Sequence, residues 1–134
     1  MTRSETERWL EFAHEDIVMA DYALSQGIFR QTCFHSQQAV EKALKGLLTA
    51  RLGTHPKSHS LEQMLLYDPN IHGELRSWQS QCRSLDRFYI PTRYVDALPG
   101  ILPTGEPTQE DAEEALRDAK AIVAAIRAKI GGGK

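Results

Sequence analysis

Apolar residues recur at helical spacing along almost the whole chain, and this pattern predicts five helices and no strand. Gly27 and Gly53 stand where the first two helices should end, since glycine readily adopts the conformation that closes a helix. Ser60-Leu-Glu-Gln63 is a capping-box sequence that opens a short third helix. The expected helices span residues 5–25, 29–52, a short stretch from Ser60, 71–89 and 108–130.

Residues 90–107 interrupt the helical pattern with four prolines and two glycines. Neither a regular helix nor a central strand tolerates that density of proline. The predicted fold is all-α: an up-and-down bundle of four long helices plus one short helix, with a long, proline-rich ordered loop before the last helix. At 134 residues the chain is expected to form a single domain, 1–134, with residues 130–134 as a flexible tail.

The second helix carries polar residues inside its apolar face. Arg30, Gln37 and Glu41, at spacing i, i+7, i+11, fall within the arc of the residues Cys33, Val40, Leu44, Leu47 and Leu48. Burying an amide and a carboxylate costs free energy unless each finds a partner. This face therefore either packs against a cation or lines a polar site, and a structural network inside the bundle stays open as an alternative.

The first helix repeats this feature, because Asp16 lies in the same arc as its apolar residues. Two inward acids, Asp16 and Glu41, need a compensating base or protonation, and we expect Arg93 or Arg30 to supply the base. A pair of carboxylates could also perform general acid–base catalysis. The expectation that we favour is that these carboxylates hold the proline-rich loop and the helices together.

The fourth expected helix has a basic stripe made of Arg76, Arg83 and Arg87. Arginine binds phosphate through two parallel hydrogen bonds, and Arg93 and Tyr94 just beyond would add a cation and a ring on which a base could stack. The alternative is a solvated face whose arginines pair with acids on their own helix or a neighbouring one.

Composition narrows the remaining choices. The net charge of −2 does not indicate attraction of the whole molecule to nucleic acid, so any polyanion site must be local. Cys33 and Cys82 lack metal-ligand spacing and are expected as buried free thiols of a soluble, cytoplasmic protein, since no long apolar run is present. His55 and His59 are four residues apart but have no further ligand nearby, and His35 is expected at the surface, so we predict no metal and no cofactor.

Two segments together resemble a known family. The string FHSQQAVEKALKGLL at residues 34–48, followed by His59-Ser-Leu61, and the later YIPTRYVDALPGILPTGEP are similar to the hallmarks of HEPN domains (higher eukaryotes and prokaryotes nucleotide-binding). The resemblance implies a homodimer with a cleft at its interface that binds a nucleotide or RNA. It also implies a minimal nucleotidyltransferase as protein partner, and in several toxin–antitoxin systems the HEPN protein is a ribonuclease.

The resemblance also indicates which residues form the site. Position 95 is Val where the family usually has Pro, whereas the following aspartate is retained. Together with the basic stripe, the motif matches give as candidate ligand-binding residues Gln37, Glu41, Lys42, Lys45, Arg83, Arg87, Tyr89, Arg93, Tyr94 and Asp96.

Catalysis is where the chain departs from the ribonuclease members, which carry Arg, four to six residues and then His near the end of the penultimate long helix. Here residues 83–90 read RSLDRFYI, without histidine, so no catalytic residue is assigned. The prediction is a non-catalytic binding module. The alternatives are an endoribonuclease toxin with a non-standard site, or a purely structural partner of another protein. The non-standard site would use Arg83, Asp86, Arg87 and Tyr89.

Overall fold

The computed structural model describes residues 4–89 and 105–132, and all the elements in these ranges are helices. They confirm the predicted all-α fold. In chain order they are α1 (Glu5–Ser25), α2 (Phe29–Leu52), α3 (Leu61–Leu66), α4 (Pro69–Leu75), the 3₁₀ helix η1 (Arg76–Trp78), α5 (Gln79–Asp86) and α6 (Gln109–Gly132). None of these helices is both long enough and apolar enough to cross a membrane.

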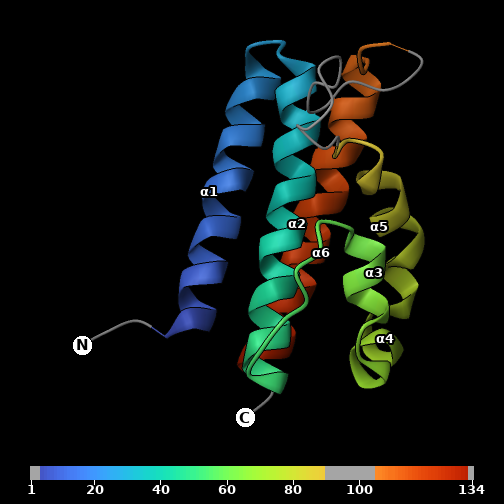
Figure 1. Cartoon of the computed structure of the whole chain (residues 1–134). Coiled ribbons are helices and arrows are strands. Elements are labelled where there is room, and N and C mark those ends of the chain that lie inside the picture. Colours follow the sequence, from blue (N-terminus) through green and yellow to red (C-terminus); the bar gives the residue numbers. More distant parts are fainter. Residues whose placement is uncertain (1–3, 90–104, 133–134) are drawn as a thin grey trace.

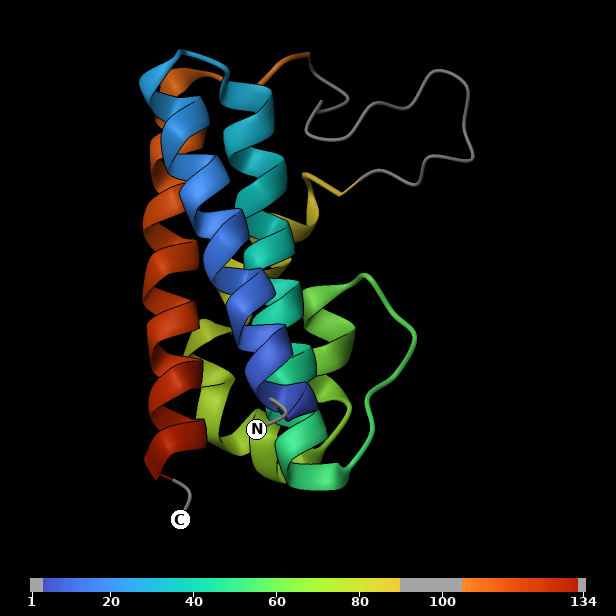
Figure 2. The same cartoon turned by 90° about the vertical axis from the view of Figure 1, so that its left-hand side faces the viewer.

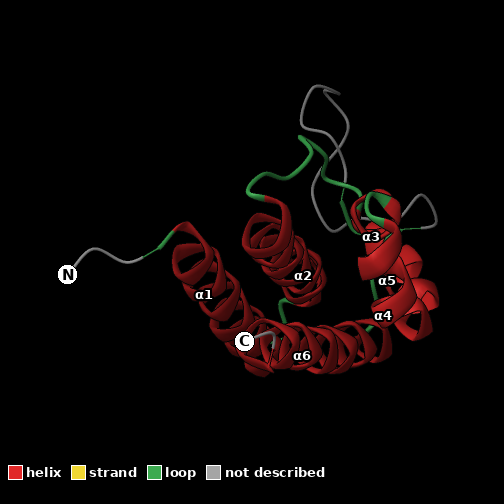
Figure 3. Ribbon diagram, turned by 90° about the horizontal axis from the view of Figure 1, so that it is seen from below, coloured by secondary structure: helices red, strands yellow, loops and turns green. Residues whose placement is uncertain are grey.

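The three long helices α1, α2 and α6 and the shorter α5 alternate in direction, as expected for an up-and-down bundle. α1 runs up, α2 runs down beside it, α5 runs up, and α6 runs down to the C-terminus (Figure 1). The first residue of α1 and the last of α6 thus lie at the same end of the molecule (Figure 2). Seen along the bundle, α2 stands between α1 and the α3–α5 group, with α6 along one side (Figure 3). α2 is therefore the central helix, and its residues Gln37 and Glu41 are buried.

α1 and α2 approach each other closely at a glycine. A Cβ atom on Gly46 would lie 3.2 Å from the Cβ atom of Trp9, so any larger residue would push the two helices apart. Gly53 then ends α2 with φ of 76°, a left-handed conformation that glycine adopts without strain. The chain leaves α2 there and runs through residues 53–60, here named the 53–60 connection, back along α2 to α3 (Figure 2).

The segment predicted as one helix over residues 71–89 is divided. α4 begins at Pro69, where Asp68 caps it, the 3₁₀ turn η1 follows, and α5 ends at Asp86. The apolar spacing that suggested one helix is nevertheless real, because its buried residues stay in the core on both sides of the turn. α6 also continues to Gly132, two residues further than predicted.

Candidate functional site

Glu41 is buried on α2 and is satisfied by three donors. Its side chain is 4% exposed, and its Oε2 atom accepts hydrogen bonds from Lys45 Nζ at 3.0 Å and from His59 Nδ1 at 3.2 Å. Its Oε1 atom accepts from Gln38 Nε2 at 3.3 Å. A carboxylate can only accept, so the His59 ring must carry its proton on Nδ1. The burial predicted for Glu41 is confirmed, and its partners are Lys45 and His59.

His59 also forms a ring stack with Tyr89. The two ring centres are 4.7 Å apart and the planes differ by 14°. Burial, and next the nearby charge of Glu41, raise the pKa of the Tyr89 phenol above its usual value. The 53–60 connection and the end of α5 thus meet over α2 through two stacked rings, and the His59 side chain is 57% exposed.

Gln37 and Asp86 link this stack to α3. Gln37 is fully buried, and its Nε2 atom donates to the backbone carbonyl of His59 at 2.9 Å and to Asp86 Oδ1 at 3.3 Å. The Asp86 carboxylate also accepts from the Ser60 hydroxyl and from the first two backbone N–H groups of α3, those of Leu61 and Glu62. Asp86 therefore caps the start of α3.

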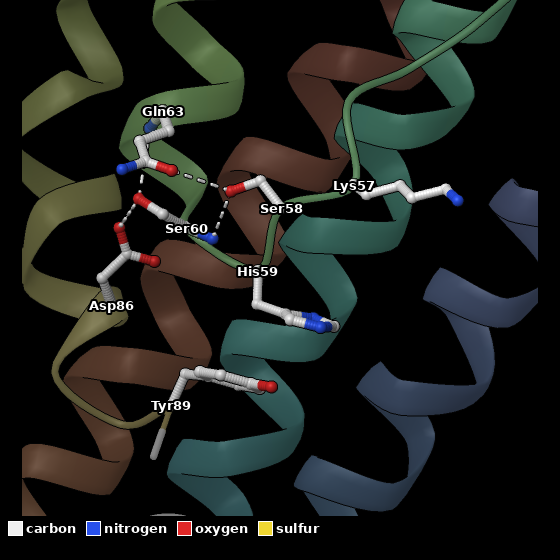
Figure 4. Close-up of a pocket in the computed structure, with 7 residues that line it drawn as sticks. All are labelled: Lys57, Ser58, His59, Ser60, Gln63, Asp86 and Tyr89. Carbon is white, nitrogen blue, oxygen red and sulfur yellow. Dashed lines mark hydrogen bonds between the residues drawn. The ribbon is translucent and has the colours of Figure 1, made fainter. Parts of the chain in front are cut away.

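A pocket of about 430 Å³ opens beside the stack (Figure 4). His59 and Tyr89 lie on one side of it, while the serines and Gln63 line the other. No ion pair among the described residues uses the Lys57 ammonium, so this cation is available to a ligand. The complete lining is Lys57, Ser58, His59, Ser60, Gln63, Asp86 and Tyr89.

A second ion group lies further along α1 and α2. Asp16 is buried as predicted, and its two oxygens contact Lys42 Nζ at 2.5 Å and His35 Nδ1 at 2.8 Å. Arg30 instead pairs with Glu106 and stays 37% exposed, so the prediction that it compensates the inward acids is wrong. Lys42 and Lys45 on α2 compensate these acids, and His35 and His59 provide further hydrogen bonds to them. His35 was expected at the surface but is only 22% exposed, because it packs against Asp16.

Lys45 connects the site to an aromatic cluster on α1. Its ammonium lies 5.4 Å from the ring centre of Trp9, a distance at which the cation is attracted to the face of the ring. The Trp9 ring meets His55 edge-on at 5.4 Å and Phe12 at 6.1 Å. Trp9 is held in place by the close approach of α1 to Gly46.

The predicted basic stripe does not form a continuous phosphate site. Arg83 donates to both carboxylate oxygens of Glu62 on α3, and this pairing lowers the pKa of Glu62 to about 2. Arg87 donates to the backbone carbonyl of Ser84 and lies 4.9 Å from the ring centre of Phe88. Arg83 therefore pairs with an acid on a neighbouring helix, as the alternative interpretation of the stripe proposed.

Three of the predicted binding residues, Arg93, Tyr94 and Asp96, lie outside the described residues. Within the described ranges, no group of His, Cys, Asp and Glu is arranged to hold a metal ion. Both cysteines are buried and free, as expected, and burial raises the pKa of each thiol to about 12, so they are unreactive.

Sequence reasoning missed how the 53–60 connection contributes. His59 was considered as a metal ligand, and Lys57 and Trp9 were not considered as site residues. His59 did stand in the matched His-Ser-Leu string, but nothing in its spacing from α2 showed that the chain doubles back over Glu41. A signal was present in the buried Glu41 itself, which needed a donor, and His59 provides one.

The family model of the HEPN domain matches residues 6–129, nearly the whole chain. The chain belongs to the HEPN family. This confirms the resemblance seen in the two motif segments, and it places α2 and the 53–60 connection, with their network around Glu41, inside the matched HEPN domain.

Similar proteins are also found among curated proteins and solved structures. "Putative toxin MJ1304" of Methanocaldococcus jannaschii is 30% identical over an aligned length of 131 positions, and the match covers 89% of this chain and 84% of the relative. The crystal structure of TT1696 from Thermus thermophilus is 35% identical with a TM-score of 0.78, over 95% of this chain and 99% of that one. ST0689, described as an archaeal HEPN homologue, is 33% identical with a TM-score of 0.74, over 97% and 99%.

Proposed function

We propose that this HEPN protein binds a nucleotide or RNA in the pocket beside the His59–Tyr89 stack. The observation that carries the proposal is the stack itself, which presents a partly exposed aromatic surface in a pocket that Lys57 also lines. The Lys57 ammonium forms no ion pair among the described residues. Any of the four bases can stack on such rings, and a lysine is suited to bind the phosphate that follows the stacked base. Glu41, which is buried and paired with Lys45, accepts a hydrogen bond from His59 and so holds this ring in place.

Polar groups of the pocket suit the remainder of a nucleotide. The Ser58 hydroxyl donates a hydrogen bond to the side-chain oxygen of Gln63, and Gln63 also lines the pocket. Hydroxyl and amide groups can hydrogen-bond to a ribose or to a base edge. Because Arg83 is occupied by Glu62, the phosphate contact in this proposal moves from the α5 arginine to Lys57.

We further propose that the protein acts as a homodimer in a toxin–antitoxin-like pair with a minimal nucleotidyltransferase. Support comes from the family and from the relative named as a toxin. Expression without the partner is then expected to slow growth, and co-expression of a minimal nucleotidyltransferase partner is expected to restore it. Growth unaffected by the HEPN protein alone would contradict the toxin part of the proposal and leave the binding part standing.

RNA cleavage is a second candidate function, and one observation favours it. Glu41 fixes the proton of His59 on Nδ1, and Nε2 has no partner among the described residues, so it can act as a base. It would take the proton of a ribose 2′-hydroxyl, whose oxygen then bonds to phosphorus. The bond from phosphorus to the 5′-oxygen breaks, this oxygen takes a proton from water, and a 2′,3′-cyclic phosphate remains.

Fluorescence anisotropy of a labelled, mixed-sequence RNA tests the binding proposal. Tyr89→Ala is expected to weaken binding by roughly 5- to 100-fold, the range for loss of one base–aromatic stack. Lys57→Ala is expected to weaken binding and to make it less sensitive to salt, since one phosphate contact is lost.

Lys120→Ala is the matched control for Lys57→Ala. It removes the same charge from an exposed lysine on α6, outside the pocket. Equal effects of the two lysine variants would show general electrostatic attraction and contradict a site at this pocket. The absence of RNA and nucleotide binding by the wild-type protein would overturn the proposal.

His59→Phe separates binding from cleavage. The phenylalanine keeps a ring for stacking against Tyr89 but offers no nitrogen base. If cleavage occurs, this variant should retain binding, lose cleavage and leave the RNA intact, while the wild type yields 2′,3′-cyclic phosphate ends. A wild type that binds RNA without cutting it would eliminate the second candidate.

A further inference from the structure

Trp9 and Phe12 form a second aromatic surface close to the first. Together with Glu5 and Arg8 they line a separate pocket of about 400 Å³ on α1. The two rings meet edge to face, and the Phe12 side of the pair is exposed. Glu5 accepts a hydrogen bond from the indole N–H of Trp9 at 3.3 Å, which fixes the orientation of the indole ring.

This second surface is joined to the first by contacts. Lys45 is the common element, since its ammonium bonds to Glu41, the partner of His59, and also lies over the Trp9 ring. The 53–60 connection also joins them, because His55 at its start touches Trp9 and His59 near its end touches Tyr89.

Cationic side chains lie close to the two aromatic surfaces. Figure 4 shows the Lys57 side chain extending from the middle of the 53–60 connection toward α1, away from Tyr89. Among the described residues, neither Lys57 nor Arg8 takes part in an ion pair. Aromatic surfaces with free cations between and beside them are the elements with which proteins bind a single strand, whose bases stack on the rings while its phosphates pair with the cations.

We propose that Trp9 and Phe12 form a second base-stacking subsite, so that the ligand is single-stranded RNA spanning both aromatic surfaces, and not a mononucleotide. This inference rests on the proposed binding function and extends it to the substrate class. A duplex is excluded from such a site because its bases are stacked on one another and cannot lie on protein rings.

Tryptophan fluorescence gives a direct readout, because the chain has only two tryptophans. Trp78 belongs to η1, between α4 and α5, and lines neither aromatic pocket. In the Trp78→Phe variant the emission comes from Trp9 alone. Oligouridylates of increasing length are titrated into this variant, and their affinity is measured in parallel by anisotropy.

Longer oligouridylates are expected to quench Trp9 and to bind more tightly than uridine monophosphate, which should bind without quenching. Phe12→Ala is expected to weaken oligonucleotide binding roughly 5- to 100-fold while leaving monophosphate binding unchanged. Tyr22→Ala is the control: it removes an exposed aromatic ring from the same helix, ten residues or about 15 Å further along, and should have no effect.

The outcomes separate this inference from the proposed function. Oligonucleotide binding that depends on Tyr89 but neither quenches Trp9 nor responds to Phe12→Ala would overturn the second subsite alone. A Phe12→Ala protein that loses its dimer in light scattering would show that a second copy of the chain covers these rings, which also overturns it. Failure of every nucleic acid to bind would overturn both proposals.

Discussion

At the scale of single residues, the site depends on the carboxylate of Glu41, a charged group that the sequence alone places on an apolar helix face. Glu41 stands among apolar residues of α2, and a charge buried there requires donors. The sequence therefore predicts that partners exist, and that prediction is confirmed. It does not identify them, because His59 is eighteen residues away and reaches Glu41 only through the path of the 53–60 connection.

Glu41→Ala is predicted to lower the free energy of unfolding by about 3–5 kcal/mol, since it leaves the largely buried Lys45 ammonium without its counter-charge. Urea unfolding followed by circular dichroism measures the change. Glu74→Ala, which removes an exposed partner of Arg51, is the control and should cost less than about 1 kcal/mol. Similar losses for the two variants would show that Glu41 is not part of a buried pair.

The Tyr89 hydroxyl is predicted to titrate above the ordinary tyrosine value of 10.0, because burial and the charge of Glu41 raise its pKa. A raised folded-state pKa makes a contribution to stability that is present below pH 10 and is lost as pH rises through the folded value. Ultraviolet titration of the wild type against Tyr89→Phe isolates this phenol. Glu41→Gln should lower the pKa of Tyr89, and an unchanged Tyr89 pKa would refute the electrostatic part of this explanation.

At the scale of elements, short α3 depends on residues from α5. Asp86 at the end of α5 accepts the first N–H groups of α3, and Arg83 one turn earlier binds Glu62. A six-residue helix is unstable by itself, so these contacts hold it in place. The capping serine was predictable from local spacing, whereas the contribution of Asp86 comes from a residue more than twenty positions away and could not be predicted.

Asp86→Asn is predicted to cost about 2 kcal/mol, because an amide oxygen accepts the α3 N–H groups more weakly than a carboxylate and the amide nitrogen cannot accept at all. Amide hydrogen exchange locates the effect. Leu61 and Glu62 should exchange faster, while α1 keeps its protection. A uniform increase over the whole chain would indicate global destabilisation and contradict a local capping role.

The Glu62–Arg83 pair predicts a stability change in acid. The folded-state pKa of Glu62, about 2, lies below its ordinary value of 4.5, so the pair contributes stability above pH 4.5 that is lost as the pH falls toward 2. The Glu62→Gln variant should therefore be less stable than the wild type at neutral pH, and the two should converge in acid. Nuclear magnetic resonance of the Glu62 carboxyl group in Arg83→Ala should show its pKa rising; a value still near 2 would contradict the pairing.

At the scale of the whole molecule, the bundle brings together residues from three separate parts of the chain. α1 contributes Trp9, α2 contributes Glu41 and Lys45, and the 53–60 connection contributes His59. Helical periodicity was sufficient to predict the all-α bundle, since it depends on local spacing. From the sequence we predicted the α2 residues of the site and, through the family motif, Tyr89; the contacts of Trp9 and His59 were not predictable, because they depend on where connections cross the surface.

Titration of a short oligouridylate, followed through the histidine ring resonances, tests the central claim most directly. The claim predicts that the signals of His59 shift strongly, while those of His72, bonded to Gln79 in the α4–α5 region, stay in place. Saturable shifts at His59 that disappear in Tyr89→Ala would establish the stack as the binding surface. Binding that leaves His59 unmoved, or that shifts His59 and His72 equally, would contradict it.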